Sequence, residues 1–190
     1  MYAIPTSWYV KVFFRFDPTR PLAANSQAPV PQPTPMFNPE LKPAYISEIA
    51  VRWSDMDELG HVNNAAYLSY MEETRTQMLN QLGFSLDDPH QGPVVVTVSC
   101  TYLRPVVYPD RLRSECLLDQ PGRSSFMTHY RVFSQQQPDE AECEGSAKVV
   151  WVDRASGRST PLPEQIRALI ERQTDTGIII PTDKDSGSVR

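Results

Sequence analysis

The sequence is poor in cysteine, and its few cysteines are scattered. Cys100, Cys116 and Cys143 are odd in number, lie far apart and occur in segments where apolar residues alternate with others. Disulfide frameworks and zinc sites instead use regularly spaced cysteines. We therefore expect buried thiols in a reducing compartment and no bound metal, and nothing in the sequence indicates a redox cofactor.

Long apolar runs and an excess of positive charge are also absent. No stretch approaches the roughly 18 apolar residues that cross a bilayer, and the first residues lack the pattern of a secretory signal. Lys and Arg total 18 against 23 Asp and Glu, a net charge of −5, which argues against a broad basic surface for nucleic acid. The sequence thus predicts a cytoplasmic protein that has neither a membrane nor a nucleic acid as partner.

Proline is concentrated at the start of the chain. Half of the 18 prolines precede residue 44, a composition typical of an extended, semi-rigid segment. Within it, residues 8–16 are aromatic and β-prone, which leaves open an added edge strand, a partner-binding arm or no functional role. With 190 residues, 40% of them hydrophobic, we expect a proline-rich extension over 1–43, one globular domain over 44–172 and a fraying tail over 173–190.

Two segments at the start of this domain have clear periodicity. Residues 45–53 place their apolar side chains, Trp53 included, on one face of a period-two pattern, which predicts a strand. After a polar turn over 54–63, apolar residues recur at three- and four-residue spacing over 64–82. That spacing predicts an amphipathic helix.

The rest of the domain is predicted to be mainly strands. We expect them over residues 94–103, 111–118, 124–133 and 142–152, with chain reversals at Pro105, Pro109-Asp110, Pro121-Gly122 and Pro138-Asp139. Because these connections are too short for crossovers, the strands should form a mostly antiparallel sheet. One long helix packed on that sheet, closed by a short helix over 163–172, is an α+β fold.

The segment between the first strand and the long helix carries most of the polar chemistry. Residues 52–64 read RWSDMDELGHVNN, and Tyr67, Glu72 and Arg75 follow on the helix. A carboxylate in this turn lies near a helix N-terminus, where free amide groups and the helix dipole favour developing negative charge. Hydrolysis of a thioester needs that combination: a group that attacks or activates water, and donors for the oxyanion.

Over roughly residues 45–169 the sequence resembles the 4-hydroxybenzoyl-CoA thioesterase-like branch of the hot-dog superfamily, which also contains long-chain acyl-CoA thioesterases. The matching elements are Asp55-Met56-Asp57, Gly60-His61-Val62-Asn63-Asn64, Tyr67, Glu72, Arg75, Tyr102-Leu103-Arg104-Pro105 and Tyr108-Pro109-Asp110. The resemblance implies a hot-dog fold, in which an antiparallel sheet wraps around one central helix. It also implies hydrolysis of an acyl-CoA to free acid and CoA by a homodimer or homotetramer.

The resemblance assigns Asp57 as the catalytic carboxylate, acting either as general base on water or as a nucleophile that forms an anhydride. It implies that the backbone amides of Asn63, Asn64 and Ala65 are the oxyanion donors. His61 either orients the carbonyl or water, or holds the loop.

Several of these residues also have a purely structural interpretation. Glu72 is a rival catalytic carboxylate, because a related branch of the superfamily uses a helix glutamate, but it could simply pair with Arg75 on the helix surface. Asp55 is interpreted as a turn former that bonds its own backbone. Asn63 and Asn64 serve as helix caps as readily as site residues.

The phosphates of CoA require Arg, Lys or backbone donors. The resemblance places Arg123, Ser124 and Ser125 near the pantetheine or nucleotide arm, with Arg104 as a further candidate, although each arginine could equally be an ordinary solvated side chain. Tyr67 is a candidate wall of the substrate pocket, and a core role explains it equally well.

Two other functions remain open from the sequence. An acyl-ACP thioesterase is favoured by the His-Val-Asn-Asn run, which plant acyl-ACP thioesterases share, but Leu59 stands where those enzymes have Asn. A non-catalytic acyl-CoA-binding protein would keep the pocket without turnover, and retention of Asp57 in a complete turn argues against it. The sequence does not determine the acyl group, because chain length depends on pocket depth.

Overall fold

The computed structural model describes residue 38 and residues 40–176. The chain divides into two units, residues 1–34 and 35–190, and the described residues all belong to the second. The expected β-prone segment over 8–16 and the end of the expected tail, from 177 onward, lie outside the described residues. The boundaries of the extension and the tail therefore stay predictions.

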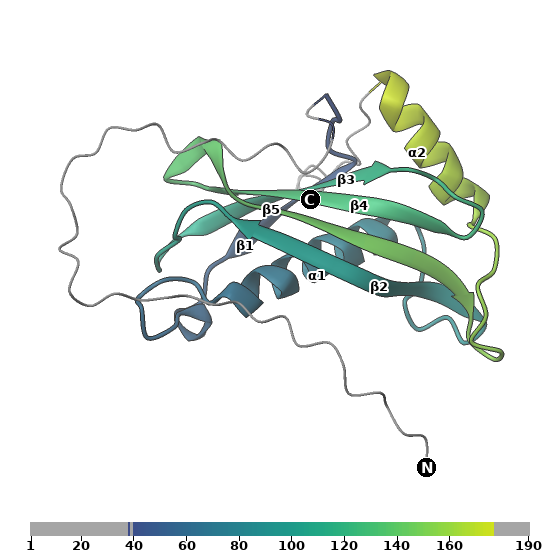
Figure 1. Ribbon diagram of the computed structural model, residues 1–190, viewed down its shortest axis with the longest axis horizontal. Coiled ribbons are helices and arrows are strands. Elements are labelled where there is room, and N and C mark those ends of the chain that lie inside the picture. Colours follow the sequence, from purple (N-terminus) through teal and green to yellow (C-terminus); the bar gives the residue numbers. More distant parts are fainter. Residues whose placement is uncertain (1–37, 39, 177–190) are drawn as a thin grey trace, which may run out of the picture. The chain divides into compact units, whose positions relative to one another are not determined.

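The described residues form a single five-stranded sheet and two α-helices (Figure 1). The strands are β1 (Tyr45–Ala50), β2 (Gln91–Tyr102), β3 (Arg111–Asp119), β4 (Ser125–Ser134) and β5 (Gln137–Asp153). They lie in the order β1-β3-β4-β5-β2, and every pairing is antiparallel. The predicted antiparallel sheet is confirmed, and β2 forms one of its edges.

The long helix α1 (Asn64–Gln81) packs across one face of the sheet. Its buried residues recur at helical spacing: Tyr67, Tyr70, Met71, Thr74, Met78 and Leu79. The buried Thr74 hydroxyl lies 2.8 Å from the hydroxyls of Ser47 on β1 and Ser114 on β3, so a small polar cluster fixes the helix position over the sheet. Asn63 caps the helix start, since its side chain accepts a hydrogen bond from the Ala65 amide at 2.8 Å.

A glycine on β5 allows the helix to approach the sheet closely. A Cβ atom at Gly145 would lie 2.3 Å from Met71 Sδ and 3.1 Å from the Ser99 carbonyl oxygen. The first distance is shorter than real Cβ contacts and the second is unusually tight, so glycine at this position lets α1 approach β5 and β2 without displacing Met71.

The second helix, α2 (Glu164–Thr176), lies beside the hairpin that joins β3 and β4 (Figure 1). There Arg167 donates a hydrogen bond to the Gly122 carbonyl at 2.8 Å. Its apolar residues Ile166, Leu169 and Ile170 belong to the same buried cluster as Met78 and Leu79 of α1. The predicted short closing helix is thus confirmed.

Two details of the predicted elements were wrong. Trp53 was placed on the buried face of the first strand, but β1 ends at Ala50 and Trp53, 77% exposed, begins the short 3-10 helix η1 (Trp53–Asp55). Pro138-Asp139 was expected to be a chain reversal, but these residues lie within β5. The pairing of β4 with β5 is irregular at this point, so Pro138 occupies a bulge where a missing N–H is tolerated.

Candidate active site

The turn between β1 and α1 is folded by its own backbone hydrogen bonds. The Asp57 amide donates to the His61 carbonyl at 2.9 Å, and the Gly60 amide donates to the Asp57 carbonyl at 3.1 Å. Gly60 has φ +78°, a conformation that favours glycine. The Val62 amide donates to Val106 at 2.8 Å, which ties this turn to the segment after β2.

Asp55 is a structural residue of this turn. Its buried carboxylate accepts hydrogen bonds from the Arg52 amide at 2.9 Å and from the Tyr70 hydroxyl at 2.8 Å, and the Arg52 guanidinium lies at 3.0 Å. Burial alone would raise the pKa of Asp55, but the hydrogen bonds from Arg52 and Tyr70 outweigh it and hold the pKa below its usual range. The side chain bonds the backbone of the turn, as expected, and also bonds Tyr70 on α1.

Asp57 is placed differently, although it lies only two residues further on. It is half-buried, and its Oδ1 accepts one hydrogen bond, from the Leu59 amide at 2.8 Å. Within the described part of the chain, Oδ2 has no hydrogen-bond partner. The residue lines a hollow of about 290 Å³ together with His61, Asn64 and Tyr67. This carboxylate therefore has an oxygen available at a concave surface.

The start of α1 offers one free backbone donor to the same hollow. The Asn63 amide already donates to the Asp55 carbonyl at 2.8 Å, and the Ala65 amide donates to the Asn63 side chain. For the Asn64 amide, no acceptor is found among the described residues, and Asn64 lines the hollow beside Asp57. Of the three expected oxyanion donors, Asn64 is thus the one whose amide finds no acceptor among the described residues.

Aromatic side chains form the inner wall of this hollow. Tyr67 is buried and makes edge-to-face contacts with Tyr70 and Tyr102, with ring centroids 5.9 and 5.4 Å apart. Burial raises the pKa of Tyr67. The Tyr102 hydroxyl donates to the Asn64 carbonyl at 2.9 Å, so Tyr102 fixes the end of β2 to the start of α1. Tyr102 was not among the predicted site residues, although it belongs to the Tyr-Leu-Arg-Pro run that matches the family.

Asp57 also lines a second hollow, of about 640 Å³. Trp53, Tyr108 and Gly60 contribute to its lining. Trp53 and Tyr108 are both exposed. Asp57 therefore lines two concave surfaces, each of which contains aromatic rings.

Arg104 lines the Asp57 hollow but is already paired. Its guanidinium contacts the carboxylates of Glu140 and Glu142 and donates to the Ala141 carbonyl at 2.9 Å. Burial raises the pKa of Glu142, and Arg104 opposes that rise. The side chain is thus held at the rim by β5, which reduces the charge it can offer to a phosphate.

Glu72 does not line the hollow that contains Asp57. It is exposed and borders a separate hollow of about 420 Å³ between α1 and β2, which Arg75 also lines. No ion pair between Glu72 and Arg75 is found among the described residues, so their expected surface pairing is not present.

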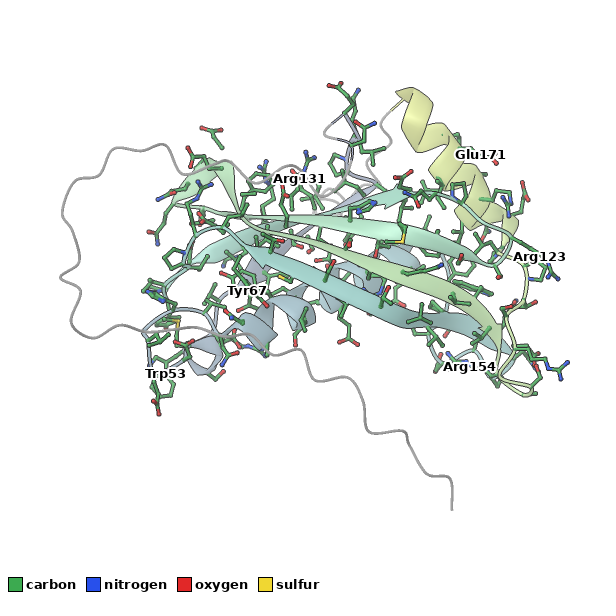
Figure 2. All side chains as sticks on the ribbon, viewed as in Figure 1. Trp53, Tyr67, Arg123, Arg131, Arg154 and Glu171 are labelled. Carbon is green, nitrogen blue, oxygen red and sulfur yellow. The ribbon has the colours of Figure 1, made fainter. Side chains whose placement is uncertain are left out.

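The hairpin residues Arg123, Ser124 and Ser125 lie far from Asp57 within one chain. They follow the end of β3, whereas the Asp57 turn lies near its start, where the Val51 amide donates to Asp110. The nine residues of β3 extend about 26 Å. Figure 2 shows Trp53 and Arg123 at opposite ends of the sheet.

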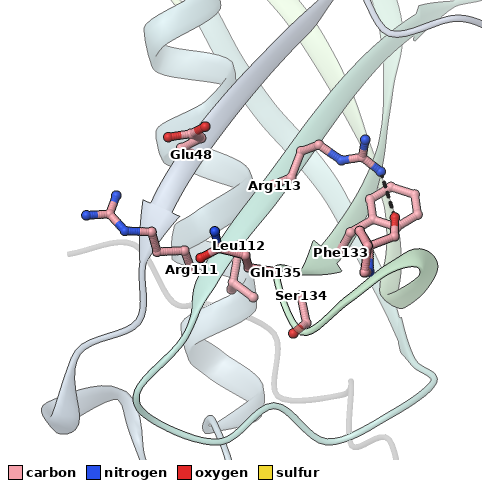
Figure 3. Close-up of a pocket in the computed structure, with 8 residues that line it drawn as sticks. Glu48, Arg111, Leu112, Arg113, Phe133, Ser134 and Gln135 are labelled. Atoms are coloured by element: carbon pink, nitrogen blue, oxygen red, sulfur yellow. Dashed lines mark hydrogen bonds between the residues drawn. The ribbon is translucent and has the colours of Figure 1, made fainter.

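Another hollow, of about 210 Å³, lies beside β1 and β3 and shares no residue with the Asp57 hollow (Figure 3). Its Arg113 guanidinium lies 4.3 Å from the centre of the Phe133 ring and donates to the Pro138 carbonyl at 3.0 Å. This hollow lacks a free amide beside a carboxylate, and we assign it no role in catalysis.

Neither a metal site nor a membrane span is found in the described part of the chain. No cluster of three or more His, Cys, Asp or Glu side chains there is arranged to hold a metal ion. None of the described helices has both the length and the apolar character needed to cross a bilayer.

Comparison with known proteins shows the family of the chain. The family described as the thioesterase-like superfamily matches residues 51–170. The structure of the PA2801 protein from Pseudomonas aeruginosa is 41% identical, with a TM-score of 0.66, and the match covers 68% of this chain and 99% of that one. The long-chain acyl-CoA thioesterase FadM of Escherichia coli is 29% identical over 66% of this chain and 96% of its own length.

A thioesterase from Thermus thermophilus, solved in complex with coenzyme A and zinc, is 34% identical with a TM-score of 0.58. That match covers 67% of this chain and 92% of the Thermus chain. The chain belongs to the thioesterase-like superfamily and has the hot-dog fold, so both the predicted family and the predicted fold are confirmed. The protein is a thioester hydrolase.

Proposed function

We propose that the protein hydrolyses an acyl-CoA to the free acid and CoA, and that Asp57 and the Asn64 amide are its catalytic groups. One observation carries this proposal: Asp57, whose carboxylate has an oxygen without a hydrogen bond among the described residues, and Asn64, whose amide has no acceptor among them, line the same hollow. The named acyl-CoA thioesterase relative and the neighbour that binds coenzyme A support the choice of carrier.

The two groups match the two requirements of thioester hydrolysis. Asp57 accepts a proton from water as the water attacks the thioester carbonyl, or attacks that carbonyl itself and forms an anhydride that water then opens. The Asn64 amide, at the positive end of the α1 dipole, donates to the oxygen as it gains negative charge. The tetrahedral intermediate then collapses, and the CoA thiolate leaves.

The neighbouring side chains have supporting roles in this proposal. Tyr67 and Tyr102 exclude water from one side of the carbonyl, and His61 orients the carbonyl or the attacking water. The second hollow that Asp57 lines, with Trp53 and Tyr108, offers aromatic faces to the CoA arm.

A homodimer would bring the CoA-arm candidates of one subunit near Asp57 of the other. β2 is a 12-residue edge strand with exposed valines, among them Val96 and Val98, and such an edge is a template for pairing with a second chain. In a two-fold antiparallel pairing of β2 edges, the Gln91 end of one strand meets the Tyr102 end of the other. Arg123 of the partner subunit would then approach the Asp57 hollow.

The test is a panel of acyl-CoA esters, short to long and aliphatic to aryl, each paired with the matching acyl-ACP and scored by thiol release. We expect turnover of at least one CoA ester above its ACP counterpart. Hydrolysis of the acyl-ACP esters alone would show that the carrier is ACP and not CoA. Tight binding of acyl-CoA without release of thiol would show instead a binding protein.

A further inference from the structure

The hollow between α1 and β2 has apolar walls, with a few charged residues among them. Leu68, Met71 and Leu79 of α1 face Val95 and Val98 of β2 across it, in a volume of about 420 Å³. Apolar walls of this kind suit a hydrocarbon chain. The same hollow is also lined by the guanidinium groups of Arg75 and Arg154 and by the carboxylate of Glu72.

Arg75 is an unusual component of this lining. Its Nη1 donates to the Tyr130 hydroxyl at 2.8 Å, and the fully buried Tyr130 donates in turn to Thr128 at 2.9 Å. The guanidinium is half-buried and has further N–H donors. In the part of the chain that the structure describes, no carboxylate lies within 4.0 Å of it. A partly buried cation without a counter-ion is unfavourable, so the site is complementary to an anion.

Along α1, the hollow lies next to the one that contains Asp57. Asn64 and Tyr67 line the Asp57 hollow, and Leu68 and Met71, on the next turn of α1, line this one. Arg75 lies 11 residues after Asn64 in the same helix, which is about 16 Å along the axis. Because helical side chains lean toward the N-terminus, its guanidinium is somewhat nearer the Asn64 amide than that.

We propose that this hollow holds the acyl chain and that Arg75 binds a carboxylate at the far end of that chain. The preferred substrates are then ω-carboxyacyl-CoA esters of medium length. The inference rests on the proposed acyl-CoA hydrolysis and adds the class of acyl group. Two guanidinium groups against one exposed carboxylate leave the hollow with net positive charge. The phosphates of CoA share this anionic chemistry, but the apolar walls and the contact with buried Tyr130 fit the end of an alkyl chain better.

The experiment compares kcat/KM for octanoyl-CoA and suberoyl-CoA, which have equal chain length and differ in a terminal carboxylate. We expect the wild type to prefer suberoyl-CoA by about tenfold or more. Arg75→Gln should lower kcat/KM for suberoyl-CoA by roughly tenfold to a hundredfold, mainly through KM, and leave octanoyl-CoA nearly unchanged. Arg75→Lys should retain part of the preference.

Arg113→Gln is the matched control, because it removes a half-exposed guanidinium from a different hollow. It should change kcat/KM for neither substrate. Equal losses on both substrates in Arg75→Gln would overturn the inference, and so would a wild type without preference. An equal loss accompanied by weaker binding of free CoA would assign Arg75 to the phosphates. An equal loss with a lower Tm would show that Arg75 stabilises the fold and does not bind the acyl group.

Binding of the free acids tests the same site without turnover. Suberate should raise the Tm of the wild type more than octanoate does, and this difference should disappear in Arg75→Gln. If no acyl-CoA were hydrolysed but suberate still bound through Arg75, only the proposed activity would fail. If octanoyl-CoA were hydrolysed and suberoyl-CoA were not preferred, only the present inference would fail.

Discussion

Asp55 and Asp57 are two residues apart, yet the structure predicts opposite results for the same substitution. Asp57→Asn should leave the fold intact, because the Asn side-chain oxygen can still accept the Leu59 amide and the position is half-exposed. We expect a change in the free energy of unfolding below about 0.5 kcal/mol. The amide can neither take a proton from water nor attack the thioester, so kcat should fall by roughly 10²–10⁴-fold if Asp57 acts as general base.

Asp55→Asn should act on stability instead. The buried carboxylate accepts hydrogen bonds from the Tyr70 hydroxyl and the Arg52 amide, and bonds to a charged acceptor are stronger than bonds to a neutral one. Loss of the charge should lower the free energy of unfolding by about 1–3 kcal/mol. Activity per folded molecule should fall far less than in Asp57→Asn.

The assay is kcat on the best acyl-CoA, with urea unfolding of each variant followed by circular dichroism. Glu72→Gln completes the set, because it tests the rival carboxylate. Near-normal turnover of Asp57→Asn together with an inactive Glu72→Gln would refute the assignment and favour catalysis from the hollow between α1 and β2. A loss of kcat beyond about 10⁴-fold would favour the nucleophilic route over general-base action.

Three further results are expected. The folded-state pKa of Asp55 is depressed, so the ionised carboxylate stabilises the fold. This contribution is fully present above the unfolded pKa of about 3.9 and is lost as the pH falls through the folded value. The urea midpoints of wild type and Asp55→Asn should therefore converge in acid and remain apart at pH 7. Gly145→Ala should lower the free energy of unfolding by about 1–3 kcal/mol, measured by urea unfolding, because the new Cβ displaces Met71; an unchanged midpoint would contradict this. Light scattering at micromolar concentration should give at least a dimer, and Val96→Lys on the exposed β2 edge should shift the mass toward that of the monomer; a monomeric wild type would argue strongly against shared active sites.

Local patterns in the sequence predicted the features that depend on neighbouring residues. The three- and four-residue spacing of apolar side chains predicted α1 to within one residue of its observed end. Asn63 and Asn64 were recognised as possible caps. A period-two pattern located β1, and segments bounded by turn residues located the other four strands, with ends that differ by several residues at β1, β2 and β5. These signals are local, because a helix cap or a strand alternation is set by residues a few positions apart.

Only the tertiary structure decided which of these residues face the site. Asp55 and Asp57 have the same chemistry in the same turn, and they differ because Tyr70 on α1 covers one carboxylate and not the other. The pairing of Arg104 with Glu140 and Glu142 brings together residues more than 35 positions apart. The same holds for the contact of Arg75 with Tyr130, 55 residues away. Burial and charge neutralisation depend on which distant segments pack together, and no local spacing encodes that choice.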